Sequence, residues 1–125
     1  IGENETWSKW SPYPGITVET TITPDADGHT RHHRIVSEIE CTAYDVGFSI
    51  ACRDEDRAAS ETDSGKAYAE NIFSECSVSG NGEAVILYTS PNTNILYRKV
   101  MMPAVKYTVS KGESIITTRV NARRK

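Results

Sequence analysis

Hydrophobic and polar residues alternate along most of the chain with the two-residue period of β-strands. In the segment 16–23, Val18 and Ile22 alternate with Glu19 and Thr21, and β-branched residues, which favour strands, dominate. No stretch shows a sustained helical period of apolar residues. The segments predicted to be strands are 16–23, 28–36, 38–43, 48–52, 69–78, 84–89, 94–102, 104–110 and 114–121. Short strands joined by turns rich in Gly, Pro and Asn predict an all-β fold, an antiparallel β-sandwich of about eight or nine strands.

Two turns set the expected order of the first strands. The segment 24–28 contains Pro, Asp and Gly, which suit tight turns, and it predicts a hairpin between 16–23 and 28–36. A second hairpin is predicted around Val46 and Gly47. It would place Cys41 opposite Cys52 on the neighbouring strand, with both side chains facing the core.

The three cysteines have a spacing that matches neither a zinc site nor a redox pair. Free cysteines commonly behave as small hydrophobic residues, so we expect buried thiols rather than a disulfide. We predict no metal and no cofactor for this domain.

The size and charge of the chain limit its function classes. Its 125 residues suffice for one domain, 1–125, and 38% hydrophobic and 25% charged residues are typical of a soluble globular domain. A formal net charge of −3 argues against nucleic acid as a partner. No apolar run is long enough to span a membrane, so we expect no membrane partner. No signal-peptide pattern opens the sequence, which favours the cytoplasm as the location without assigning it. Because residue 1 is Ile rather than Met, we expect the chain to be a piece of a longer protein.

The most unusual chemistry lies in the segment 28–36, which holds all three histidines of the chain and two arginines. On a strand, His29, Arg31 and His33 would share one face, and His32 and Arg34 would share the other. Each face would then carry a cation, and a cation in the core is costly unless it is paired.

Three interpretations of this strand stay open. The histidines could make ordinary hydrogen bonds in a half-buried sheet, or bind a metal with a ligand from another strand that the sequence does not identify. They could also face a cleft where a histidine and Arg31 or Arg34 bind an anionic or sugar ligand. We expect a contact surface rather than a metal site, with one arginine paired inside the domain and the other, with His29 and His33, free to face a cleft or another domain. Replacing Arg31 by Ala would then leave the melting temperature of the domain almost unchanged. The expected glutamate partners are Glu19, Glu38 and Glu40.

Trp7 and Trp10 form a second candidate feature near the start of the chain. We expect their side chains to cap one edge of the core, and stacking on a sugar ring is the alternative. The spacing of residues shows no Ser/His/Asp arrangement, Gly-rich phosphate loop or paired carboxylates. The catalytic residues therefore stay unassigned, and enzymatic activity is left open.

The motifs resemble those of a known domain family. The matching stretches are 10–12, 16–20, 28–35 and 45–50. They resemble the C-terminal β-domain of a poorly characterised bacterial and fungal family in which an α/α-toroid precedes a β-sandwich, an architecture similar to heparinase II/III-type polysaccharide lyases. The resemblance covers 10–50 and places the family's histidines on His29 and His33, its arginines on Arg31 and Arg34, and its hairpin on 47–48.

The resemblance implies an accessory β-sandwich domain at the C-terminal end of a glycan-active, lyase-like protein. This domain would pack on the α/α-toroid, its partner in the same chain, and line the cleft that holds an oligosaccharide. In the analogous lyases the catalytic groups lie mainly in the toroid, so we expect the isolated domain not to be catalytic. A stand-alone carbohydrate- or protein-binding module and a purely structural domain are the alternatives.

Overall fold

The structure, a computed structural model, describes residues 5–52, 59–63, 65–88 and 99–125. In this part of the chain it contains β-strands and no helix, so no helix there could cross a membrane. The all-β prediction is confirmed. The strands are β1 (Thr6–Tyr13), β2 (Ile16–Pro24), β3 (Gly28–Ser37), β4 (Cys41–Val46), β5 (Ile50–Cys52), β6 (Ala59–Asp63), β7 (Lys66–Glu70), β8 (Ser74–Gly80), β9 (Glu83–Tyr88), β10 (Lys99–Val109) and β11 (Gly112–Arg124).

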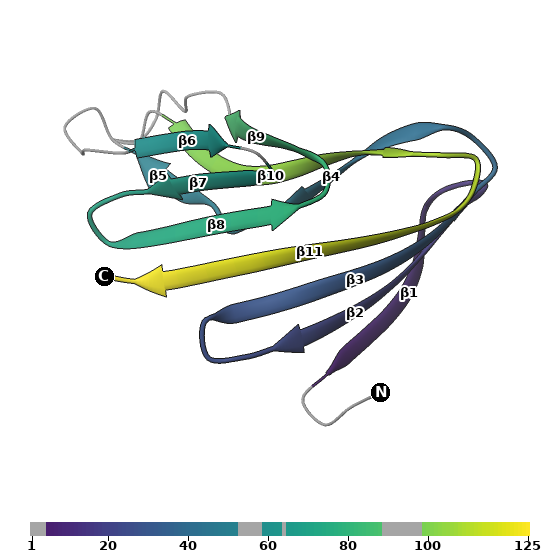
Figure 1. Cartoon of the computed structure of the whole chain (residues 1–125), viewed down its shortest axis with the longest axis horizontal. Coiled ribbons are helices and arrows are strands. Elements are labelled where there is room, and N and C mark those ends of the chain that lie inside the picture. Colours follow the sequence, from purple (N-terminus) through teal and green to yellow (C-terminus); the bar gives the residue numbers. More distant parts are fainter. Residues whose placement is uncertain (1–4, 53–58, 64, 89–98) are drawn as a thin grey trace.

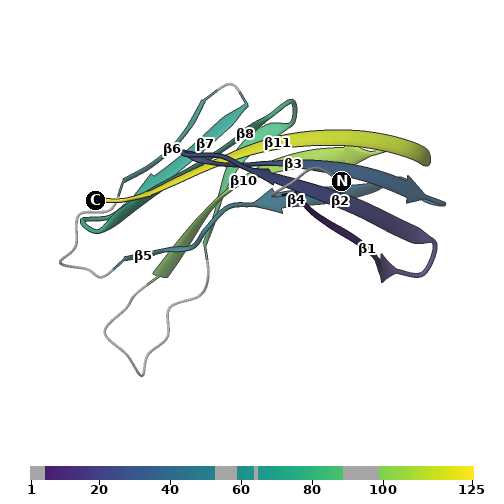
Figure 2. The same ribbon diagram turned by 90° about the horizontal axis from the view of Figure 1, so that it is seen from below.

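The strands form two antiparallel sheets, as predicted for a sandwich. The larger sheet has seven strands in the order β1-β2-β3-β11-β8-β7-β6, which Figure 1 shows face on. The smaller sheet has four strands, with β10 in the centre, β9 along one edge and β4 and β5 along the other. Figure 2 shows β5 and β10 beneath β6, β7, β8 and β11 of the larger sheet.

The core lies between the two sheets and is built from the inward positions of the alternating pattern. Its fully buried side chains include Val78 and Val120 of the larger sheet and Met101, Val105 and Val109 of β10. Burial of such apolar side chains contributes roughly 1.5–3 kcal/mol each to stability. The strand β10 therefore serves as the centre of the smaller sheet and as one wall of the core.

The expected hairpin around Val46 and Gly47 is wrong. β4 and β5 do not pair with each other; both pair with β10, one after the other along the same edge. Gly47 continues this path, because its N–H donates to the carbonyl of Pro103 at 2.8 Å. Within a strand the N–H and C=O of one residue point to the same side. The carbonyl of Pro103 points toward the segment between β4 and β5, but proline has no N–H to donate to a carbonyl of that segment. The ladder is interrupted at this point.

This arrangement also separates the two cysteines that were expected to face each other. Cys41 lies opposite Val109, and Cys52 lies opposite Lys99 at the other end of β10. Cys41 and Cys76 are free thiols, half-buried and buried respectively. The side chain of Cys52 lies outside the described residues.

The boundaries of several strands differ from the prediction for physical reasons. The hairpin of β2 and β3 is confirmed, and the Asp25 carboxylate closes its turn by accepting the N–H groups of Asp27 and Gly28. The segment 69–78 is two strands, because the Asn71 side chain accepts the N–H groups of Phe73 and Ser74 and turns the chain. β1 and β6 have no alternation of apolar residues and were not predicted. The predicted strand 94–102 lies largely outside the described residues.

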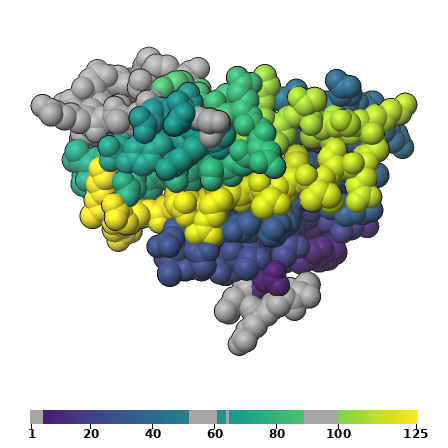
Figure 3. Space-filling model, in the orientation of Figure 1, coloured from purple at the N-terminus to yellow at the C-terminus, as the bar shows by residue number. Residues whose placement is uncertain are grey.

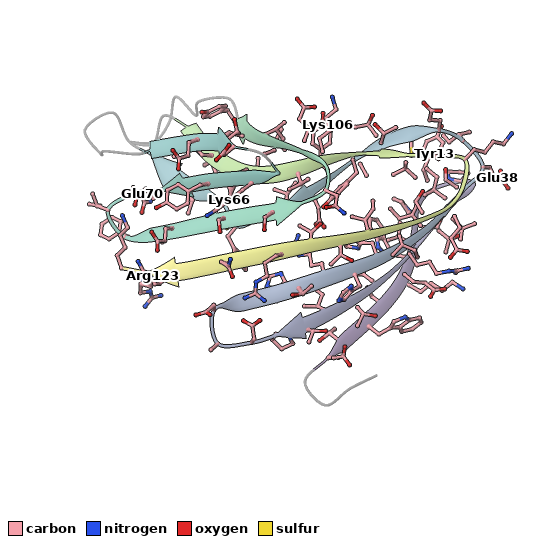
Figure 4. All side chains as sticks on the ribbon, viewed as in Figure 1. Tyr13, Glu38, Lys66, Glu70, Lys106 and Arg123 are labelled. Carbon is pink, nitrogen blue, oxygen red and sulfur yellow. The ribbon has the colours of Figure 1, made fainter. Side chains whose placement is uncertain are left out.

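The two sheets do not cover each other evenly. β9 and β10 pack against β7 and β8, whereas β1 is the far edge of the larger sheet. Figure 3 shows β11 as a continuous band between β7–β8 on one side and β2–β3 on the other. In Figure 4, Tyr13 and Glu38 mark one end of the molecule, and Glu70 and Arg123 mark the opposite end. The uneven cover leaves the inner face of β1 and β2 next to an open cleft at the Tyr13 end.

Candidate functional site

The strand β3 carries the histidines and arginines as the alternation predicted. His29, Arg31 and His33 point inward, between the sheets, and His32 and Arg34 point outward. The inward side chains of Arg31 and His33 are each 17% exposed. The two faces of β3 therefore take part in two different sets of contacts.

A carboxylate from the opposite sheet pairs with the inward face. Asp45 on β4 accepts a hydrogen bond from Nη1 of Arg31 at 2.7 Å and another from Nε2 of His33 at 2.7 Å. The same Nη1 also donates to the carbonyl of Val46 at 2.8 Å. Arg31, Asp45 and His33, which we call the inter-sheet triad, thus tie β3 of the larger sheet to β4 of the smaller sheet.

The inter-sheet triad is further held by hydroxyl groups. Thr118 on β11 hydrogen-bonds to the Asp45 carboxylate, and the hydroxyl of Tyr107 lies 2.7 Å from that of Thr118. Nδ1 of His33 lies 2.8 Å from the hydroxyl of Thr20, which can donate or accept as the histidine requires. Both ring nitrogens of His33 therefore have partners.

The environment of Asp45 keeps its carboxylate ionised. Burial acts to raise the pKa of Asp45, but hydrogen bonds from His33, Thr118 and Arg31 outweigh burial and lower that pKa to about 2. Since Asp45 is an acceptor at both oxygens, Nε2 of His33 must carry a proton. Asp45 is therefore a fixed negative charge at ordinary pH.

His29 extends the network along β3. Its Nε2 accepts a hydrogen bond from Nε of Arg31 at 2.9 Å, so this nitrogen is unprotonated. Burial lowers the pKa of His29, and the positive charges of Arg31 and Arg119 lower it further. The ring of Phe48 meets the His29 ring edge-on, with 6.1 Å between centroids.

The expectation of one unpaired arginine is wrong. Arg34 pairs with Glu113 at 3.1 Å and with Glu19 at 3.5 Å, so the predicted glutamate Glu19 is a partner. Arg31 pairs with Asp45 rather than with Glu38 or Glu40. Both cations are thus satisfied inside the domain, and Arg31 is a structural contact between the sheets.

Sequence reasoning missed Asp45, because it assigned 44–47 to a turn. The alternation contained a usable signal, since Asp45 lies an even number of positions from Cys41, which was predicted to face the core, and therefore shares its face of the strand. A carboxylate at an inward position is costly to bury unless it is paired, so it predicts a cation on the opposite sheet. Arg31 was the matching candidate.

A cleft of about 350 Å³ opens between the sheets beside the triad. His33 and Asp45 lie among its lining residues, with apolar side chains from both sheets. Two aromatic residues of β1 line it with well-exposed side chains, Trp10 at 54% and Tyr13 at 63%. Tyr44 of β4 also lines it, but its side chain lies on the outer face of the smaller sheet, at the position opposite Lys106. The remaining lining residues are Pro12, Ile16, Val18, Ile35, Cys41, Thr42, Ala43, Tyr107, Val109 and Ile116.

The two tryptophans lie on opposite faces of β1 and do not jointly cap one edge of the core. Trp10 lies opposite Val18 on the inner face and lines the cleft. Trp7 lies opposite Thr21 on the outer face. There it lines a smaller hollow of about 140 Å³ whose walls include the outward residues His32, Arg34 and Ile115. The cap interpretation is therefore wrong for Trp7, and the cleft gives Trp10 a position open to a ligand.

The described residues contain no group of three or more His, Cys, Asp or Glu side chains placed to hold a metal ion. The histidines of β3 are divided between its two faces and are bound to protein partners. The expectation that this strand is a contact surface for a ligand or another domain stays a prediction.

Comparisons with known proteins place the chain in a family. Searches of the curated proteins and of the solved structures found no match. The family model of the DUF2264 C-terminal domain matches residues 2–122. The chain therefore belongs to this family, a C-terminal domain of unknown function. The match supports the expected C-terminal domain of a poorly characterised family, and the likeness to heparinase II/III-type lyases stays a prediction.

Proposed function

We propose that this DUF2264 C-terminal domain is the accessory β-sandwich domain of a glycan-active, lyase-like protein, and that the cleft between its sheets binds a saccharide. The observation that carries the proposal is the position of Trp10 and Tyr13, two exposed aromatic side chains of β1 at one cleft. Aromatic faces offer a broad apolar surface on which the C–H face of a sugar ring can stack. The cleft volume of about 350 Å³ falls within the range of small-ligand sites.

The wall of the cleft supports binding because it is rigid. His33 and Asp45 line it and are fixed by hydrogen bonds to Thr20, Arg31 and Thr118. A ligand would not have to order these side chains on entry, which lowers the entropic cost of association. The triad therefore acts as a preformed support rather than as a mobile element.

The proposal includes a second domain of the same protein, an α/α-toroid, packed on the outer face of the larger sheet. On that face Trp7, Ile115 and Val36 are 48%, 66% and 40% exposed, beside the Arg34 ion pairs. Apolar side chains rimmed by charged groups are typical of contact surfaces between proteins or domains. His32 and Arg34 would then serve the contact with the toroid, while the inner face of β3 serves the cleft.

The test is a screen of the 125-residue chain against immobilised oligosaccharides, followed by calorimetric titration of the best ligands. Trp10→Ala should weaken binding about tenfold or more, because stacking aromatic residues commonly dominate such sites. Trp7→Ala is the matched control, since Trp7 lies on the same edge strand but on the opposite face. Absence of saccharide binding, or equal losses in the two variants, would refute the cleft as the binding site.

A further inference from the structure

The charges in the cleft restrict the kind of saccharide that it can hold. Among its lining residues, all of which the structure describes, His33 is the one side chain able to carry a positive charge and Asp45 the one carboxylate. These two groups are hydrogen-bonded to each other at 2.7 Å. The cleft thus offers a ligand no unpaired cation.

Arg31 lies next to the cleft but is not available to a ligand. Nη1 donates to Asp45 and to the carbonyl of Val46, and Nε donates to His29. Turning the guanidinium toward a ligand would leave Asp45, a residue that is only 9% exposed, without its ion pair to Arg31. Breaking a buried ion pair in this way is strongly unfavourable.

A carboxylate on the ligand would therefore lose its hydration without gaining a cation, and it would approach the negative charge of Asp45. Such desolvation is costly for an ionised group. The walls point to the opposite kind of ligand, because Ile16, Val18 and Ile35 on one sheet and Ala43 and Val109 on the other are apolar.

We infer that the cleft selects a neutral pyranose unit and discriminates against uronates. This inference rests on the proposed function, since it names the substrate class of the same site. It also goes beyond the lyase analogy, because a lyase that eliminates across a uronate must hold a carboxylate. In a mixed glycan the cleft would hold a neutral unit, while uronate chemistry would take place elsewhere in the protein.

Matched pairs of trisaccharides test the inference by calorimetric titration of the 125-residue chain. Each pair consists of a uronate and the neutral sugar obtained by reducing its carboxyl groups: β-1,4-glucuronate with cellotriose, α-1,4-galacturonate with α-1,4-galactotriose, and β-1,4-mannuronate with mannotriose. In at least one pair the neutral sugar should bind, and the affinity for the matching uronate should be lower by a factor of about ten or more. The affinity for the neutral sugar should not change between 0.05 and 0.5 M NaCl, over which the Debye length falls about threefold, since no ion pair forms.

A variant with a cation added at the cleft gives an independent readout. Tyr13 lines the cleft and is 63% exposed, so Tyr13→Lys can be made without disturbing the core. Tyr13→Ala, which removes the same ring without adding a charge, is the matched control. Compared with this control, we expect Tyr13→Lys to bind the uronates several-fold more tightly and in a salt-sensitive way, and to bind the neutral sugars with little difference.

The outcomes separate the inference from the proposed function. Binding that is lost in Trp10→Ala but favours the uronates would overturn the inference and leave the proposed function standing. No binding of any trisaccharide, or binding unaffected by Trp10→Ala, would overturn both. Neutral selectivity that is lost in Trp10→Ala would support both.

Discussion

At the scale of single residues, Asp45 decides how β3 is used. Its carboxylate accepts hydrogen bonds from Arg31 and His33, and this pairing makes a charged inner face compatible with a sandwich core. Without Asp45 the inward cation would lack a carboxylate partner on the opposite sheet. The same alternation that brings Arg31 inward leaves Arg34 on the exposed outer face.

Arg31→Ala should therefore destabilise the domain strongly. Removing one partner of a buried ion pair leaves Asp45 uncompensated, and we expect the free energy of unfolding to fall by about 3 kcal/mol. The measurement is urea denaturation followed by tryptophan fluorescence. Arg34→Ala, on the same strand but in an exposed ion pair, should leave the denaturation midpoint almost unchanged. Equal stabilities of the two variants would show that the triad contributes nothing to the fold.

The pKa of Asp45 predicts how stability depends on pH. Its pKa is lowered from 3.8 to about 2, so between these values the unfolded chain binds more protons than the folded one. Stability is then fully present above pH 3.8 and is lost as the pH falls toward 2, by roughly 2 kcal/mol for this group. In Asp45→Asn the loss of stability that the Asp45 carboxyl causes between pH 3.8 and 2 should disappear, although the variant should be less stable than the natural chain at every pH. Urea denaturation at several values between pH 2 and 6 measures both slopes, and parallel curves would contradict the prediction.

At the scale of elements, the position of Pro103 explains why β4 and β5 form one interrupted edge. The chain passes Gly47 closely over the core, where an added Cβ would lie 2.5 Å from Cγ2 of Val78 and 2.9 Å from Sγ of Cys76. These neighbours belong to the larger sheet and are almost fully buried. The interruption is thus also a site of tight contact between the sheets.

Gly47→Ala should destabilise the domain by roughly 1–3 kcal/mol, since overpacking a well-packed core forces its neighbours to move. Ser49→Ala, in the same connection at an exposed position, is the control and should change stability by less than about 0.5 kcal/mol. Thermal denaturation compares the two variants. A Gly47→Ala variant as stable as the natural chain would show that the connection can shift away from the larger sheet.

The sequence predicted the local features of these elements better than their partners. The alternation in 16–36 gave the β2–β3 hairpin and the two faces of β3, because both depend on neighbours in the chain. It could not show that β4 and β5 share one edge of β10, because that pairing joins segments far apart in sequence. It also missed β1, whose residues are all exposed, since an edge strand without a buried face has no apolar period.

At the scale of the whole molecule, the unequal widths of the two sheets create the cleft. The larger sheet extends to β1, and the exposed ring of Trp10 stands at its uncovered inner face. The sequence placed Arg31 and His33 on the inner face of β3, but it did not show that Asp45 pairs with both. Arg31 and His33 support the cleft wall, and the aromatic residues form the accessible surface.

The last prediction concerns catalysis by the isolated chain. In the cleft, both ring nitrogens of His33 face protein partners, the Thr20 hydroxyl and the Asp45 carboxylate, and Asp45 is ionised and paired, so neither residue directs a proton donor at a bound sugar. We therefore expect the 125-residue chain to show no turnover on polysaccharides. The measurement is the ultraviolet absorbance of unsaturated uronates after incubation with polygalacturonate, alginate and heparin, together with a reducing-sugar assay for hydrolysis. Product formation that persists in His33→Gln and Asp45→Asn would place a catalytic group elsewhere in the domain. If these variants abolish product formation, the triad itself is catalytic and does not serve only to support the cleft wall.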